Sequence, residues 1–317
     1  MKNFSAVDII VIIVIIILIF FRQAKYANIL IGLYLIYTVT KNLQTIKANR
    51  GIKAYNAGDT EKAIEILDKV ANSTRSKPYI KSSYGYILLR EGQIDKSEKY
   101  LKEVYEIKNL DERTKFNNIL NYSILKWKQG NPEEGIRLLE SIKDKFTNST
   151  FYEIYGYLSI STGDYAKSLE INKEAYNYNN TDDIITDNLA QSYYFLGQYD
   201  KAAELYKDII DDVKFPEAFH YYGMIKWKQG KYKEAYNLLL QSASLKSSFL
   251  SNITKEELDN TFKKFEKYLE ENNIDLESDT NIESESKNNI QTEKNEKVET
   301  SKLVENKSDD LTNEDNQ

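Results

Sequence analysis

The sequence predicts an all-α protein, and three observations support that prediction. Only three of its 317 residues are proline, a glycine-containing motif recurs about every 34 residues, and an unbroken apolar run lies near the N-terminus. Helix interiors tolerate few prolines, and a fixed period of that length is typical of stacked helical hairpins. We therefore expect a helical-hairpin solenoid of about six repeats with a C-terminal capping helix, preceded by one or two transmembrane helices.

The composition excludes several kinds of site. The chain has no cysteine, so it cannot form disulfides, thiolate zinc sites or a cysteine nucleophile, and its single histidine, His220, cannot build a multi-histidine metal site. The net charge is −6, of which residues 271–317 contribute −9, leaving about +3 for the rest of the chain. A positive charge this mild argues against a nucleic-acid-binding surface.

Two apolar stretches lie at the N-terminus. The first, residues 9–21, contains only Ile, Val, Leu and Phe. Each stretch is shorter than the ~20 residues that a spanning helix prefers, but bilayer thinning and snorkelling of flanking basic side chains can make up the difference. A cleaved signal peptide is the alternative, and the bulky aromatic pair that ends the first stretch counts against it. We expect a membrane anchor over residues 1–43, as a helical hairpin of 5–21 and 26–41.

Basic residues indicate how such a hairpin would be oriented. Lys41, Lys47, Arg50 and Lys53 follow the second stretch with no acidic residue among them. Cytoplasmic segments next to a membrane are enriched in such residues, so we expect both ends of the hairpin and the body of the protein in the cytoplasm. If only the first stretch spans, the body lies on the outer side, and the sequence leaves that alternative open.

The body of the chain contains six copies of one motif. Each copy has a glycine, any residue, a turn-forming or aromatic residue, two polar residues and a small residue, and the copies begin at Gly58, Gly92, Gly130, Gly163, Gly197 and Gly230. A glycine can adopt the left-handed conformation that ends a helix. Five residues after each glycine, and seven before it, stands a small residue that would let two antiparallel helices approach closely. The motif therefore predicts six helical hairpins over residues 44–249.

In these features the chain resembles the tetratricopeptide-repeat family. The small residues match the eighth and twentieth positions of the family pattern, and the seventh position is matched by Tyr84, Tyr122, Tyr155, Leu189 and Tyr222. The first repeat departs from the pattern with Lys47 and Arg50 at apolar positions, so we expect its first helix to continue from the apolar N-terminal segment. The interval between the second and third glycines is four residues longer than the first, which predicts an added helical turn near residues 109–113.

A cap and a tail follow the repeats. Thr254 and Glu257 have the spacing of a capping box, and Leu258, Phe262, Phe265 and Leu269 then recur on one helical face. We expect residues 250–270 to form a helix that covers the open end of the last repeat, although a free amphipathic helix has the same pattern. Residues 271–317 contain no aromatic side chain and many acidic ones, which predicts a disordered tail.

The resemblance also implies a binding surface. In this family the first helix of each repeat lines a concave groove, and the matching positions form the candidate partner-binding set: Tyr55, Tyr86, Arg90, Trp127, Lys128, Tyr157, Tyr194, Trp227 and Lys228. Gln191 and Met224 stand at the same repeat position as Tyr86 and Tyr157. Rings with a few cations suit an extended or helical peptide, with some preference for acidic ones. Some relatives clamp a terminal carboxylate, but Asn49, Asn121 and Asn188 lack the accompanying basic set.

These observations favour a protein without catalytic residues, metal or cofactor. No phosphate-binding glycine loop, metal-ligand spacing or nucleophile motif is present in the sequence. The first hypothesis is a protein–protein interaction scaffold that holds a protein or peptide partner at the cytoplasmic face of a membrane. Two alternatives are an extracytoplasmic factor in envelope or secretion assembly and a regulatory subunit of a membrane enzyme.

Overall fold

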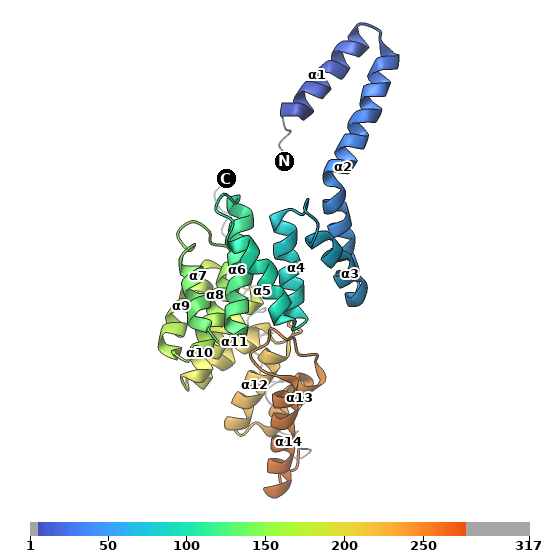
Figure 1. Ribbon diagram of the computed structural model, residues 1–317. Helices are drawn as coiled ribbons and strands as arrows, with labels where there is room; N and C mark the ends of the chain where they lie inside the picture. Colours follow the sequence, from blue (N-terminus) through green and yellow to red (C-terminus); the bar gives the residue numbers. More distant parts are fainter. Residues whose placement is uncertain (1–5, 277–317) are drawn as a thin grey trace, which may run out of the picture. The chain divides into compact units, whose positions relative to one another are not determined.

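The computed structural model describes residues 6–276, and every regular element within that range is an α-helix. The predicted all-α fold is therefore confirmed (Figure 1). Of the predicted tail, residues 277–317 lie outside the described range, as does Ser5 at the N-terminus. The helices are α1 (Ala6–Phe20), α2 (Ala24–Asn56), α3 (Thr60–Ala71), α4 (Pro78–Arg90), α5 (Ile94–Tyr105), α6 (Glu112–Lys128), α7 (Pro132–Glu140), α8 (Ser149–Ser161), α9 (Tyr165–Tyr178), α10 (Asp183–Phe195), α11 (Tyr199–Ile209), α12 (Pro216–Lys228), α13 (Tyr232–Ser244) and α14 (Lys255–Glu271).

The chain divides into two compact units. The first covers Met1–Asn188 and the second Leu189–Gln317, so the boundary falls within α10. In both units a helix that starts a repeat packs against the helix that follows it, as in the pairs α4 with α5 and α12 with α13. These pairs are the antiparallel hairpins that the repeated motif predicts.

The turn glycines end the first helix of each hairpin as expected. All six motif glycines have positive φ angles, between 71° and 85°. In each turn the backbone closes onto the end of the preceding helix, for example from Gly130 N to Trp127 O at 2.8 Å. A side chain would strain this left-handed conformation, which explains why the motif begins with glycine every time.

Small residues bring the paired helices together, also as expected. A Cβ atom on Gly85 would lie 2.8 Å from Leu101, and one on Gly223 would lie 2.8 Å from Leu239. Ser97, a small residue on the partner helix, donates its hydroxyl to the carbonyl oxygen of Gly85 at 2.7 Å. Close contact between the helices of a hairpin therefore depends on these positions.

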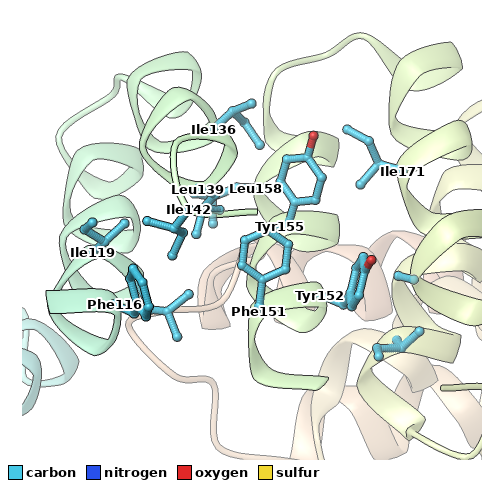
Figure 2. Packing of buried hydrophobic residues seen from close by; sticks show 13 residues of the cluster. Phe116, Ile119, Ile136, Leu139, Ile142, Phe151, Tyr152, Tyr155, Leu158 and Ile171 are labelled. Atoms are coloured by element: carbon cyan, nitrogen blue, oxygen red, sulfur yellow. The ribbon is translucent and has the colours of Figure 1, made fainter. Parts of the chain in front are cut away.

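The core of the first unit runs between the helix pairs. One cluster joins α6, α7, α8 and α9 around Phe151 and Tyr155, whose ring centroids lie 5.5 Å apart (Figure 2). A second cluster joins α2, α3, α4 and α5 around Tyr84 and Tyr100, at 4.9 Å. Tyr84, Tyr122 and Tyr155 are all at most 5% exposed, so the seventh repeat position belongs to the core.

The two irregularities in the repeats have the expected structural cause. α6 has 17 residues where α4, α8, α10 and α12 have 13 each, which is one added turn. α2 is a single helix of 33 residues that contains both the second apolar stretch and the first helix of repeat one. The basic residues Lys47 and Arg50 therefore lie on a helix that began outside the repeat.

The N-terminal helices differ from what the sequence predicts. α1 folds back along the first half of α2, and the Tyr34 hydroxyl donates to Asp8 Oδ1 across the hairpin at 3.0 Å (Figure 1). Within residues 6–276, however, no helix has both the length and the hydropathy needed to cross a bilayer, so the predicted transmembrane helices at 5–21 and 26–41 are not found. α1 has 15 residues, which reach roughly 22 Å against the ~30 Å of a hydrocarbon core. α2 is long enough but becomes polar and basic after Thr40.

The predicted cap forms as a helix. Thr254 and Glu257 make the full capping box, in which each side chain accepts a hydrogen bond from the other residue's backbone amide. Phe265 and Leu269 of α14 are buried against Ala235 and Leu239 of α13. α14 thus covers the last hairpin of the second unit, and the packing continues past its end to Ile274 and Leu276.

Candidate partner-binding surface

In the first unit, the predicted groove residues come from the first helices of successive repeats. Tyr55 lies on α2, Tyr86 and Arg90 on α4, Trp127 and Lys128 on α6, and Tyr157 on α8. α4 packs beside α6 and α6 beside α8, so the three helices form one layer. The rings are half-buried and Arg90 is exposed, in contrast to the buried tyrosines of the core. We call these six residues the aromatic surface.

Two groups of contacts organise the aromatic surface. The Arg90 guanidinium lies 5.4 Å from the centre of the Tyr55 ring, and the Tyr55 hydroxyl donates to Glu91 Oε1 at 2.7 Å. Burial and this bond to Glu91 raise the pKa of Tyr55 to about 12, so its hydroxyl stays neutral and remains a donor.

In the second group the Trp127 and Tyr157 rings meet edge to face, with centroids 5.3 Å apart. Lys128 Nζ lies 4.0 Å from the Trp127 ring, within the range of a cation–π contact. Each group thus combines aromatic rings with one cation and leaves part of the rings accessible.

The structure adds acidic residues that the sequence did not single out. Glu153 precedes Tyr157 by one turn of α8 and lies near Asp182. Burial first, and then repulsion and hydrogen bonding with Asp182, raise the pKa of Glu153 to about 7. Glu153 also raises the pKa of Tyr86, although burial has the larger effect there. The surface expected to favour acidic partners therefore contains carboxyl groups as well as cations. In the sequence, the one signal that Glu153 lies on this surface is its repeat position, three residues before the small residue Gly156.

In the second unit the predicted residues have different surroundings. Tyr194 is half-buried between Tyr199 and Tyr221, at centroid distances of 5.6 and 5.0 Å. Lys228 is exposed, and its Nζ lies 5.1 Å from the Tyr199 ring.

Trp227 lies beneath the capping helix. Its ring centroid is 4.8 Å from Phe265 and 5.3 Å from Tyr268, both on α14. A shallow pocket remains beside it, lined by residues that include Met224, Trp227, Tyr232 and Tyr268. The equal repeat positions of Trp127 and Trp227 therefore do not give them equal surroundings. The sequence predicts the aromatic face of α14, but it does not predict that this face packs on Trp227.

Gln191 and His220 are buried on the corresponding helices of the second unit. Gln191 is fully buried, and its Oε1 accepts a hydrogen bond from Asn252 at 2.9 Å. His220 is 7% exposed, and burial lowers its pKa to about 4 against a small opposing effect of Glu257. Within residues 6–276 no group of three or more histidine, aspartate or glutamate side chains is arranged to hold a metal ion.

The fold and its repeated turn geometry define a helical-hairpin repeat protein. Tetratricopeptide-repeat sequence profiles match residues 81–109 and 188–245. These matches identify tetratricopeptide repeats in those two segments. No curated protein matches the sequence significantly.

Several solved structures share the fold. A tetratricopeptide repeat protein from Parabacteroides merdae is 13% identical, with a TM-score of 0.58 over 80% of this chain and 97% of that one. The type IV pilus biogenesis factor PilW is 16% identical, with a TM-score of 0.54 over 63% and 91%. PilF from Pseudomonas aeruginosa is 16% identical, with a TM-score of 0.51 over 69% and 97%. At these identities the likeness shows the fold alone.

Proposed function

We propose that this protein is a non-enzymatic interaction scaffold that binds a segment of a partner protein on the aromatic surface and is attached to a membrane by its N-terminal hairpin. The aromatic surface carries the first part of the proposal. Tetratricopeptide repeats mediate protein–protein interaction, and half-exposed rings on successive first helices supply apolar area with little loss of side-chain entropy on binding.

The mixed charges of this surface suit a partner segment that is itself mixed. Arg90 and Lys128 offer two cations above aromatic rings, and Glu153 lies on the same layer of helices. A purely acidic segment would meet repulsion at Glu153, which is about half ionised near pH 7, and a purely basic one at the two cations. The partner expected here therefore carries apolar anchors with charges of both signs.

Site-specific photo-crosslinking tests the binding surface. A photoreactive residue in place of Arg90, which is exposed, should crosslink a discrete partner in cells. The same residue in place of Lys102, which is exposed on the second helix of the same repeat, is the matched control. Mass spectrometry of the crosslinked product identifies the partner. Equal crosslinking from both positions would contradict the assignment of the surface.

The hairpin supports the second part of the proposal because its apolar side chains are uncovered. Ile10 and Ile16 of α1 are 59% and 60% exposed, and Ile36 of α2 is 63% exposed. Exposed aliphatic area on this scale is unfavourable in water, at about 25 cal/mol per Å². An apolar hairpin can bury such area in the upper part of a bilayer without crossing it. The basic residues after Thr40 favour the cytoplasmic face.

Flotation with lipid vesicles tests the attachment. Replacing Ile10 and Ile16 with lysine should abolish co-flotation, while replacing the exposed Lys102 and Lys207 with glutamate in the repeats should leave it intact. Protease access to the C-terminal region in intact and lysed cells then reports the side of the membrane. Flotation that survives the isoleucine changes would exclude the hairpin as the attachment.

The alternatives use the same repeats differently. The body could lie outside the cytoplasm and assist envelope or secretion assembly, and PilW and PilF, which share the fold, are type IV pilus proteins by description. It could instead be a regulatory subunit of a membrane enzyme. Digestion of the body by protease added to intact cells favours the first alternative, and co-purification of an enzyme favours the second.

A further inference from the structure

One segment of the second unit contacts the first helices of two repeats, on the face where the proposed function places a partner. Residues 246–254 lie between α13 and α14 and form no regular helix. We call this segment the strap. Asn252 of the strap donates from Nδ2 to Gln191 Oε1 at 2.9 Å, although the two residues are 61 positions apart in the chain. Gln191 stands at the same repeat position as Tyr86 and Tyr157 of the aromatic surface.

A second contact attaches the strap to α12. Ser251 donates its hydroxyl to Glu217 Oε1, and both side chains are buried. Glu217 precedes His220 by three residues on the helix that starts the last repeat, and His220 occupies the repeat position of Glu153 in the first unit. The strap therefore contacts the face of α10 and α12 that corresponds to the aromatic surface.

The strap also has an ordered structure of its own. Ser247 donates its hydroxyl to the carbonyl oxygen of Ile253 at 3.0 Å, and the backbone amide of Ile253 donates to Ser251 Oγ at 3.1 Å. Ile253 is only 7% exposed. These bonds form a compact turn that presents the Ser251 hydroxyl, the Asn252 amide and the Ile253 side chain. A bound peptide segment would present groups of the same kinds to the face of α10 and α12.

We propose that residues 246–254 act as an internal ligand of the second unit, which occupies the inner face of α10 and α12 and competes there with any external segment. This inference rests on the proposed function, because it takes the first helices of the repeats to be the binding face. An external ligand for this face would be a short, uncharged segment with a hydroxyl donor for Glu217 and a side-chain amide for Gln191. While the strap is in place, partner binding is confined to the aromatic surface of the first unit.

His220 provides a measurement that needs no partner. It is the only histidine of the chain and is buried. Glu217 precedes it by three residues on α12, and Glu257 at the start of α14 lies near enough to affect its pKa. Its Nδ1 has no hydrogen-bond partner among the residues that the structure describes, so a small reagent that reaches it can react. Diethyl pyrocarbonate acylates a neutral imidazole, and the product is followed by its ultraviolet absorbance. The rate of that reaction in the full-length protein therefore reports how accessible the face of α12 around His220 is, and Glu217 on the same helix is the residue that the strap contacts.

The variant Ser251→Ala with Asn252→Ala removes both side-chain contacts. We expect His220 to react at least tenfold faster in this variant than in the unchanged protein at pH 7.5. Ser244→Ala is the matched control, because that hydroxyl donates to the carbonyl oxygen of Gln241 in its own helix, and the rate in this variant should not change. Asn252→Ala alone, a milder change, should give an intermediate rate. Circular dichroism establishes that each variant keeps its helical content.

A rate that is the same in all three variants and the unchanged protein would overturn the proposal. So would rapid acylation of His220 in the unchanged protein. If the double variant loses its helices, the single variant decides by the same criterion. Because the measurement lies wholly in the second unit, it can fail while crosslinking from Arg90 succeeds, and the two proposals are therefore tested separately.

Discussion

Trp127 and Trp227 occupy the same place in two copies of one pentapeptide, but the structure gives them different roles. Trp127 packs at the edge of the core cluster around Phe151 and contacts Tyr157 and Lys128, whereas Trp227 lies beneath two rings of α14. Trp227→Ala removes a partly buried ring and should therefore cost folding free energy, up to the about 3–5 kcal/mol of a large core side chain. Trp127→Ala should cost less stability and weaken partner capture at least tenfold. Urea denaturation measures the loss of stability, and the yield of crosslinked partner measures the loss of binding. Equal losses of stability in the two variants would contradict the different roles given to Trp127 and Trp227.

Glu153 should make the first unit less stable as the pH rises. Its folded pKa is about 7, raised from 4.5 by burial and by Asp182. Between pH 4.5 and 7 the folded protein keeps a proton that the unfolded chain has released, so stability falls with increasing pH through this window. Glu153→Gln should remove this dependence and stabilise the protein at pH 8. Denaturation curves of both proteins at pH 5 and pH 8 measure the difference, which vanishes if Glu153 titrates normally.

His220 should act in the opposite direction in the second unit. Burial lowers its pKa from 6.5 to about 4, so between those pH values the unfolded chain binds a proton that the folded protein excludes. The stability that the neutral, buried imidazole contributes is fully present above pH 6.5. It is lost progressively as the pH falls from 6.5 toward 4. Acidification from pH 6.5 to 5 should cost about 2 kcal/mol through this group, at about 1.4 kcal/mol per unit of pH. His220→Gln should lose that decline; if the two proteins respond alike to acid, the residue is not buried as described.

At the scale of the element, Gly156 has the least room for a side chain among the glycines for which neighbouring atoms are described. A Cβ on this residue would lie 2.0 Å from Asn172 Oδ1, which belongs to a fully buried side chain of α9. Gly156→Ala should therefore destabilise the first unit by about 1–3 kcal/mol, because the packed hairpin must open. Gly32→Ala is the matched control, since Gly32 also lies in a helix but has no neighbouring atom within 4 Å. That change should be neutral or stabilising. Thermal melts of the two variants compare them directly.

The elements themselves could be predicted well from the sequence. Turn glycines, small contact residues, the added turn in α6 and the capping box of α14 all depend on neighbours within about one repeat, so the pattern contains the information. The surroundings of Trp227 and Gln191 depend on α14 and the strap, which return from later in the chain. An apolar face predicts that a helix is covered, but it does not predict which segment of the chain covers it. The apolar runs were known to be short for a bilayer, but the expectation that thinning and snorkelling would make up the difference is not met by any helix of residues 6–276.

At the scale of the whole molecule, the continuity of α2 has a mechanical consequence. A helix of 33 residues spans roughly 50 Å. It contains no turn between the apolar segment that pairs with α1 and the segment that pairs with α3. Rotation of the hairpin about the helix axis is therefore transmitted to the first repeat through the backbone hydrogen bonds.

The direction in which Tyr55 points is consequently set by the angular phase of α2. One residue inserted after Asn42 would turn the first repeat by about 100° relative to the hairpin, whereas seven inserted residues would restore nearly the original phase. With the hairpin held on vesicles, crosslinking of a partner from Arg90 should fall after the single insertion and recover after the longer one. A membrane that fixes the hairpin would thus also fix the azimuth at which this protein presents its binding face.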